Sequence, residues 1–305
     1  MSLTKAQLKE RLGMITGSNA GTILGVNPYS SKYCMWATKR GRRVVDKFKG
    51  NNKTLLGTAL EPFCVQMYEQ ATGRKVRQVK KTFRHKQYPF IGGHIDGIVL
   101  GSDKQNGPRG LECKVVTPDG MGKWFDDYGN IVIPPYYRAQ VLHYALITRR
   151  MTWDFSVIFT DGRHDHEIIT IKFFKDDLDD YLKKCIEFWE LVESGTPPPV
   201  DDSKATADAL RNEWPTTQPG SVKVATHEVC DYMWTRQMHK EMKEAHESKV
   251  QLATNNYMNY MQDAETLISP SGVIMATSKL DKNSRVRNSF KTITEERFNG
   301  EPTTI

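Results

Sequence analysis

The chain has few cysteines, and none is close enough to another in sequence to form a metal-binding pair. The five cysteines stand at positions 34, 64, 113, 185 and 230 of 305 residues, with no Cys-x-x-Cys among them. Zinc modules and iron–sulfur centres take ligands from such closely spaced pairs, so the spacing argues against both. Scattered single cysteines fit a reducing cytoplasm.

Long apolar segments are also missing. The first ten residues, MSLTKAQLKE, lack the apolar core of a signal peptide, and no long uncharged apolar run indicates a membrane span. We therefore expect a cytoplasmic protein with no membrane partner. The length of 305 residues is enough for one sizeable core or two smaller ones.

Positive charge is in excess. The chain has 43 Lys and Arg against 36 Asp and Glu, a formal net charge of +7, which favours an anionic partner without identifying it. Two basic clusters, KRGRR at 39–43 and RKVRQVKK at 74–81, are candidates for contacting the phosphates of a duplex. Each cluster taken singly is equally consistent with solvated surface.

The most informative motif is Glu112-Cys113-Lys114, with Asp96 sixteen residues upstream. Apolar residues alternate with Glu112 and Lys114, so in a strand the carboxylate and the amine share one face. Asp96 is the single acid in an apolar, glycine-rich run and needs a cation or a hydrogen-bond network beside it. Two carboxylates can hold Mg²⁺ while an ammonium positions water or phosphate. A pair of solvated charges is the ordinary alternative for Glu-x-Lys.

A third acid, Glu61, lies in a segment with helical apolar spacing, directly before Pro62. Because proline is tolerated best as the first helical residue, we expect one kinked helix or a turn followed by a helix opening at Pro62. Glu61 would then sit at a structural break. It is either directed at the metal or a capping carboxylate near a helix N-terminus.

A glutamine belongs to the predicted helix over 135–148. Tyr137, Gln140, Val141 and Tyr144 share a face of this helix through their three- and four-residue spacings. The Gln140 amide must be satisfied if it is buried. A site of carboxylates, water and phosphate would satisfy it, and a nearby backbone group is the alternative.

The N-terminal segment from Glu10 to Gly25 suggests a phosphate pocket. Ser18 is a good N-cap candidate for a short helix ending near Gly25. Free N–H groups at a helix start bind phosphate, and Arg11 could grip the same anion bidentately. An ordinary cap with Arg11 on a solvated face is the alternative.

The remaining pattern predicts the α/β class, with a central mixed sheet flanked by helices. Residues 152–160 and 167–174 are typical of two strands joined through Asp161-Gly162, and 176–195 of a helix stopped by Gly195. The Pro-rich stretch at 196–202 indicates a linker, so we expect a core at 1–198. The extension at 199–305 should hold a long helix or helical hairpin over about 226–267 and then short strands.

Five segments, taken in order, resemble the YqaJ-type viral recombinase family, the phage lambda exonuclease family within the PD-(D/E)XK nuclease superfamily. They are Arg11–Ser18 (RLGMITGS), Gly57–Pro62 (GTALEP), Asp96-Gly97, Leu111–Lys114 (LECK) and Tyr137–Gln140 (YRAQ). The resemblance covers approximately residues 5 to 195. It implies a Mg²⁺-dependent exonuclease that degrades the 5′-ended strand of linear double-stranded DNA.

The resemblance also implies roles for individual residues. Asp96 and Glu112, with the backbone carbonyl of Cys113, would be the metal ligands. Lys114 would orient or activate water, Glu61 would help to organise the metal, and Gln140 would lie near the nucleophile. Arg11 and Ser18 match the pair that holds a terminal 5′ phosphate in this family. His94 departs from the family's small hydroxyl residue, which puts a phosphate contact there in doubt.

We therefore expect an exonuclease that produces 3′ overhangs for phage-type recombination by strand annealing, in a bacterial cytoplasm. The resemblance implies two Mg²⁺ ions, with Mn²⁺ as a substitute, a homo-oligomer such as a trimeric ring, and a single-strand annealing protein as partner. A related endonuclease or flap nuclease is the enzymatic alternative. A DNA-end-binding scaffold without catalysis is the alternative from another class.

Overall fold

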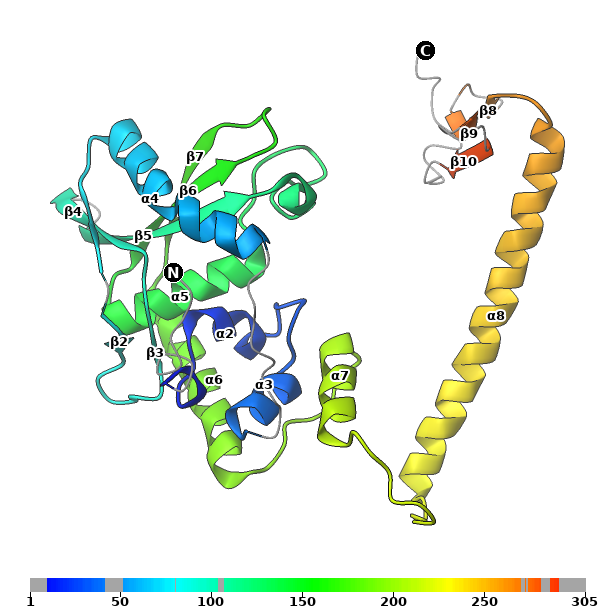
Figure 1. Ribbon diagram of the computed structural model, residues 1–305, viewed down its shortest axis with the longest axis horizontal. Helices are drawn as coiled ribbons and strands as arrows, with labels where there is room; N and C mark the ends of the chain where they lie inside the picture. The colour runs from blue at the N-terminus through cyan, green and yellow to red at the C-terminus, as the bar shows by residue number, and fades with distance from the viewer. Residues whose placement is uncertain are drawn as a thin grey trace. The chain divides into compact units, whose positions relative to one another are not determined.

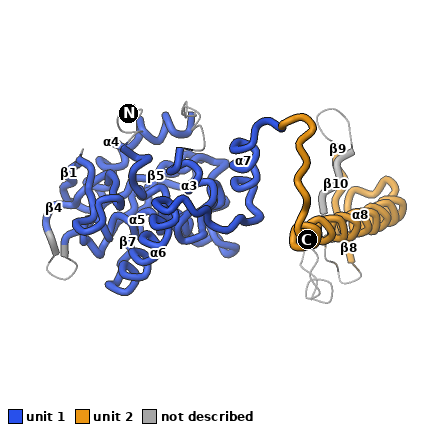
Figure 2. Tube along the Cα trace, turned by 90° about the horizontal axis from the view of Figure 1, so that it is seen from below, with its two compact units in different colours: residues 1–217 blue, residues 218–305 orange. Residues whose placement is uncertain are grey.

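A computed structural model describes residues 10–41, 52–79, 81–103, 107–269, 272, 274–280 and 286–290. Arg42, Arg43 and Lys80 of the two basic clusters lie outside the described residues. The chain forms two compact units, Met1–Thr217 and Gln218–Ile305, coloured separately in Figure 2.

The first unit is built on a five-stranded mixed sheet. Its strands are β1 (Val76–Gln78), β4 (Gly97–Asp103), β5 (Gly107–Val116), β6 (Thr152–Phe159) and β7 (His166–Lys172), in the order β1-β4-β5-β6-β7. Only β5 and β6 are parallel. A parallel pair needs a crossover connection, which here contains helix α5 (Pro135–Thr148). The predicted α/β class with a mixed sheet is confirmed.

Helices cover both faces of this sheet, as Figure 1 shows for α4 (Asn52–Thr72) and α5. Successive side chains of a strand point to opposite faces. Along β6, Asp154 accepts a hydrogen bond from Tyr68 of α4, and Ser156 donates one to the Cys64 carbonyl. The intervening Trp153 and Phe155 are fully buried in the core to which α5 contributes. The face that carries Phe155 is therefore the α5 face.

Three predicted elements follow the sequence pattern closely. The strands expected near 152–160 and 167–174 are β6 and β7, which pair antiparallel. The helix expected at 176–195 is α6 (Lys175–Ser194), and Gly195 ends it with a φ of +77°. Glycine adopts this left-handed conformation without a steric penalty, which explains the clean stop.

Two local predictions need correction. Of the two alternatives at Pro62, the structure has the single helix: α4 runs through Pro62, so Glu61 lies in the middle of a 21-residue helix and is not a capping carboxylate at an N-terminus. Ser18 is not an N-cap: helix α2 (Gly17–Ile23) is capped by Thr16, whose N–H donates to Asn19 Oδ1. Ser18 is the second helical residue, one position after the start.

The first compact unit reaches Thr217, beyond the boundary at residue 198 predicted from the Pro-rich stretch. The reason is helix α7 (Lys204–Glu213), which packs against α3 (Lys32–Lys39). Buried Thr206 donates a hydrogen bond to Ser31, and Tyr33 donates one to Glu213. Polar contacts across this packing tie the residues after the linker to the core.

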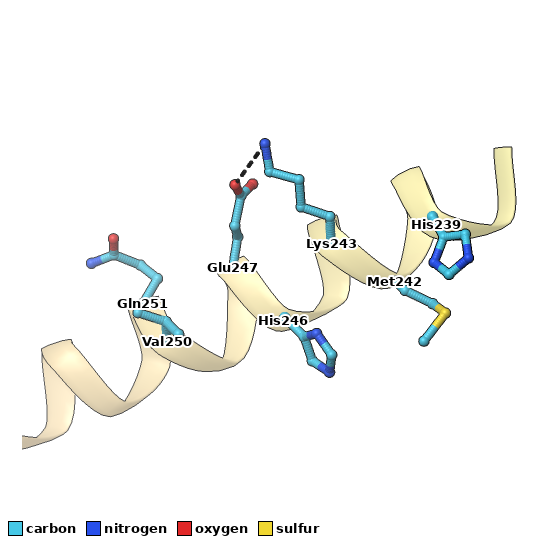
Figure 3. A pocket seen from close by; sticks show the side chains of 7 residues that line it. All are labelled: His239, Met242, Lys243, His246, Glu247, Val250 and Gln251. Atoms are coloured by element: carbon cyan, nitrogen blue, oxygen red, sulfur yellow. Dashed lines mark ion pairs between the residues drawn. The ribbon is translucent and has the colours of Figure 1, made fainter. Parts of the chain in front are cut away.

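The second unit contains helix α8 (His227–Met261) and a three-stranded antiparallel sheet of β8 (Thr266–Ile268), β9 (Ile274–Leu280) and β10 (Val286–Phe290). The predicted long segment is thus a single 35-residue helix and not a helical hairpin. One face of α8 has an open hollow, and Figure 3 shows that all the residues lining it belong to this helix. None of the described helices is both long and apolar enough to span a membrane.

Candidate active site

Strand pairing brings the two predicted carboxylates together. Strands β4 and β5 are antiparallel with Gly97 opposite Leu111, so Asp96 and Glu112, the neighbours of these two residues, lie side by side. Asp96 Oδ2 accepts a hydrogen bond of 2.9 Å from the Cys113 N–H. This bond fixes the Asp96 carboxylate against the strand that carries Glu112.

Glu112 is almost completely buried, with 1% of its surface exposed. One carboxylate oxygen, Oε1, accepts from Lys114 Nζ at 2.5 Å and from Gln140 Nε2 at 2.8 Å. The other oxygen, Oε2, is buried without a hydrogen-bond partner. Burial and then the nearby Asp96 charge raise the pKa of Glu112 to about 8. A buried acid beside a second acid, with one oxygen unsatisfied, is unfavourable unless a cation joins it.

This arrangement fits a divalent metal through hard oxygen ligands. Asp96 and Glu112 supply carboxylate oxygens side by side, the Cys113 carbonyl follows directly on the same strand, and oxygen donors suit Mg²⁺. Among the residues that the structure describes, no group of three or more His, Cys, Asp or Glu side chains could hold a metal ion by itself. Because Mg²⁺ usually keeps several waters and is bound through one or two carboxylates, the two acids are sufficient as protein side-chain ligands.

Lys114 points into the same site. Its ammonium donates to Glu112 and, at 3.2 Å, to Gln140 Oε1, and it lies 4.4 Å from the centre of the Tyr137 ring. Burial lowers the pKa of Lys114, but the Glu112 and Asp96 charges outweigh it and the pKa is raised. Lys114 is therefore charged. An ammonium has three donors, so one remains after these two hydrogen bonds.

The Gln140 amide is satisfied by the site and not by the backbone. Its Nε2 donates to Glu112 and, at 2.9 Å, to the Tyr144 hydroxyl, while its Oε1 accepts from Lys114. Helical spacing places Gln140 and Tyr144 one turn apart on α5. The amide thus holds the carboxylate and the ammonium at a fixed separation.

The sequence analysis placed Tyr144 on the face of Gln140 but missed its hydrogen bond to Gln140 and the packing of its ring on Gly17. The Tyr144 ring is buried and lies against Gly17 of α2, where an added Cβ would come within 2.4 Å of Cε1. The nearest signal in the sequence is the four-residue spacing from Gln140. No local sequence pattern indicates the role of Gly17, because Tyr144, on which it packs, is more than a hundred residues away in the chain.

Glu61 is close enough to be coupled to the site electrostatically. Burial and then the Asp96 charge raise its pKa, and Lys114 opposes this shift. Among the described residues, no hydrogen bond joins Glu61 to Asp96, Glu112 or Lys114. Glu61 therefore lies near the acidic pair without belonging to its hydrogen-bond network.

Arg11 and Ser18 meet at the start of α2. Arg11 Nη2 donates to Ser18 Oγ at 2.9 Å, and Thr16 Oγ1 lies 3.1 Å from the same oxygen. The half-buried Lys39 side chain donates its amine hydrogens to the main-chain carbonyls of Arg11 and Met14, which holds this segment in place. Gly17 links this cluster to the acidic site, because it packs on Tyr144.

Comparison with known proteins shows what part of the chain is similar to. Residues 7–151 match the YqaJ-like viral recombinase domain. The uncharacterized protein YqaJ of Bacillus subtilis (strain 168) is 27% identical over 266 residues, which cover 85% of this chain and 78% of that relative. The predicted resemblance to this family is therefore confirmed over residues 7–151.

Solved structures resemble the chain more distantly. The alkaline exonuclease LHK-Exo from Laribacter hongkongensis has a TM-score of 0.48 and 19% identity, covering 63% of this chain and 94% of that chain. A phage-related exonuclease from Haemophilus somnus 129PT has a TM-score of 0.40 and 12% identity, and the match covers 60% of this chain and 96% of that chain.

Proposed function

We propose that the protein is a Mg²⁺-dependent exonuclease that degrades the 5′-ended strand of linear double-stranded DNA and leaves a 3′ overhang. One observation carries the proposal: the orphaned Glu112 Oε2 lies beside Asp96, with a charged lysine fixed on the other carboxylate oxygen. A pair of solvated surface charges would not be buried in this way. The geometry is suited to cleavage of a phosphodiester.

The metal would be held by Asp96, Glu112 and the Cys113 carbonyl. We propose two Mg²⁺ ions, which Mn²⁺ could replace. Divalent metals polarise a phosphoryl oxygen and lower the pKa of water. The third N–H of Lys114 is available to orient the attacking water or to contact the scissile phosphate. Gln140 fixes the positions of Lys114 and Glu112 by hydrogen-bonding to both, and Glu61 adds negative charge near the metal ligands.

The proposed 5′ polarity rests on the Arg11–Ser18 pair. A guanidinium can bind a terminal phosphate through two parallel hydrogen bonds, and the Ser18 hydroxyl is a further donor. The segment is held by Lys39 and packs through Gly17 on Tyr144, so it has a fixed place relative to the acidic site. His94 contacts Thr82 at 3.4 Å, and we assign it no phosphate contact.

The biological setting is part of the proposal. A 3′ overhang is the substrate of a single-strand annealing protein, which we propose as partner in phage-type recombination. We further propose a phage or prophage protein acting in a bacterial cytoplasm, as a homo-oligomer such as a trimeric ring that would enclose the DNA.

Strand-resolved digestion tests the proposal. A linear duplex with a 5′-phosphate end is compared with a 5′-hydroxyl end and a closed circle, with Mg²⁺ or with EDTA. We expect Mg²⁺-dependent loss of the phosphorylated 5′ strand, with the circle spared and the preference for phosphate removed by Arg11→Ala. Cutting of the circle would instead assign an endonuclease. Bound ends without any product would assign a scaffold.

A further inference from the structure

A group of cationic side chains lies at the β1 edge of the sheet, in a hollow of the first unit. The hollow is lined by Arg77, Gln78, Val79, Lys81, Phe83, Ile98 and Arg150, and no acidic residue is among them. Three positive charges therefore face one recess. Like charges gathered in one recess repel one another unless an anion lies between them.

The three cations have no ion-pair partner in the part of the chain that the structure describes. Among the described residues, Arg77, Lys81 and Arg150 form no ion pair with a carboxylate. Lys81 lies over the Phe83 ring at 4.9 Å, and Arg150 donates only a long 3.4 Å bond to the Thr148 carbonyl.

Arg150 is the least favourably placed of the three cations. Its Nε is buried without a hydrogen-bond partner. Burial and then the neighbouring Arg77 charge lower the pKa of Arg150. A guanidinium with an unused donor beside a like charge is satisfied by an anion that accepts several hydrogen bonds. Phosphate oxygens match the fork of a guanidinium in this way.

The sheet register places the hollow on the same face as the acidic site. Arg77 is opposite Ile98 on β4, and Ile98 is opposite Gly110 on β5, two residues before Glu112. Paired residues share a face, and so do residues two apart. Two interstrand steps and two residues correspond to about 12 Å between the backbones at Arg77 and Glu112. A DNA strand covers that distance in about three or four nucleotides.

We propose that this hollow binds a backbone phosphate of the DNA away from the scissile bond, through Arg77, Lys81 and Arg150. The inference rests on the proposed DNA substrate, but it requires binding and not hydrolysis. A phosphate here would neutralise the three like charges and give the Arg150 Nε a partner. The site would add affinity without base specificity, because phosphates carry no sequence information.

The test is the salt dependence of binding to a fluorescein-labelled 30-base-pair duplex in EDTA, where no metal-dependent cleavage occurs. The variant is Arg77→Ala/Lys81→Ala, both exposed positions. The control is Lys183→Ala/Lys184→Ala on α6, which removes the same charge from other exposed positions. Each phosphate contact contributes about 0.9 to the slope of log K against log salt, and the hollow holds one phosphate, so the variant slope should fall by about 0.9. Between 50 and 200 mM salt the affinity gap to the parent should narrow by about 3.5-fold.

An unchanged slope in the variant, or an equal fall in the control, would overturn the proposal. An arm with inorganic phosphate at constant ionic strength separates the two sources of the ligand. Thermal stabilisation of the parent but not of the variant by inorganic phosphate, with equal DNA slopes, would assign the hollow to free phosphate and also overturn it. A protein that shows the slope change but never cleaves DNA would refute the proposed nuclease while leaving this site intact.

Discussion

Gly17→Ala should destabilise the first compact unit and slow DNA cleavage, although alanine is the better helix former. A Cβ at Gly17 would lie 2.4 Å from Tyr144 Cε1 and 2.9 Å from the Tyr144 hydroxyl. Both distances are far inside normal contact. The Tyr144 ring is buried, and its hydroxyl accepts a hydrogen bond from Gln140. A shift of the ring would therefore shift the amide that holds Glu112 and Lys114.

The magnitude follows from two opposing terms. Replacing a helical glycine by alanine stabilises by about 1 kcal/mol when space is available. Forcing a methyl group into a packed interior costs about 1–3 kcal/mol. The net change should be a loss of up to about 2 kcal/mol in the free energy of unfolding. Because the strain falls on Gln140, we expect the cleavage rate to drop by more than the loss of folded protein accounts for.

Gly57→Ala is the matched control for stability. Gly57 is also helical, in α4, but an added Cβ there would have no atom within 4 Å. This substitution should stabilise by about 0.5–1 kcal/mol. Urea unfolding midpoints and initial cleavage rates are measured for both variants. Equal stabilisation by the two substitutions, or normal cleavage by Gly17→Ala, would refute the reasoning. In a Tyr144→Leu background, which removes the ring, the cost of Gly17→Ala should disappear.

Three further outcomes are expected. Lys114→Ala should lower cleavage by at least about 100-fold while duplex binding in EDTA persists; normal turnover would remove the assigned role. Mg²⁺ at about 100 times its Kd should stabilise the parent by about 2.7 kcal/mol in thermal unfolding, and Asp96→Asn should remove this gain; equal gains would place the metal elsewhere. Burial lowers the pKa of His143 to about 4. Between pH 6.5 and pH 4 the unfolded state therefore binds more protons than the folded state, and the free energy of unfolding decreases as the pH is lowered. The loss from pH 7 to pH 5 should be about 2 kcal/mol more in the parent than in His143→Gln, measured by urea unfolding; equal losses would show that His143 does not titrate as inferred.

Much of the candidate site could be predicted because its signals are local. Alternation around Glu112 and Lys114 puts both on one face of a strand, and the structure has them on the α5 face of β5. The helical spacing of Gln140 likewise survives in α5. Strand and helix periods are properties of a few consecutive residues, so tertiary contacts did not alter them.

The errors arose where distant contacts decide. Pro62 left open one kinked helix or a helix opening at the proline. The structure has one helix through the proline, because α4 is anchored to β6 through Tyr68 and Cys64. Ser18 was a reasonable cap, yet Thr16 holds that position and leaves Ser18 to Arg11. In each case packing or a competing hydrogen bond outweighed the local preference.

The sequence alone indicated the candidate groups for the chemistry. They are two carboxylates, a lysine, a glutamine and an arginine–serine pair. Only the tertiary structure decided that Asp96 lies beside Glu112, that Glu112 keeps one oxygen unsatisfied, and that Gly17 must leave room for Tyr144. It also brought Arg77 and Arg150 to one hollow. The physical reason is that periodicity is set within a few residues, whereas burial, electrostatic coupling and close packing arise between segments far apart in the chain.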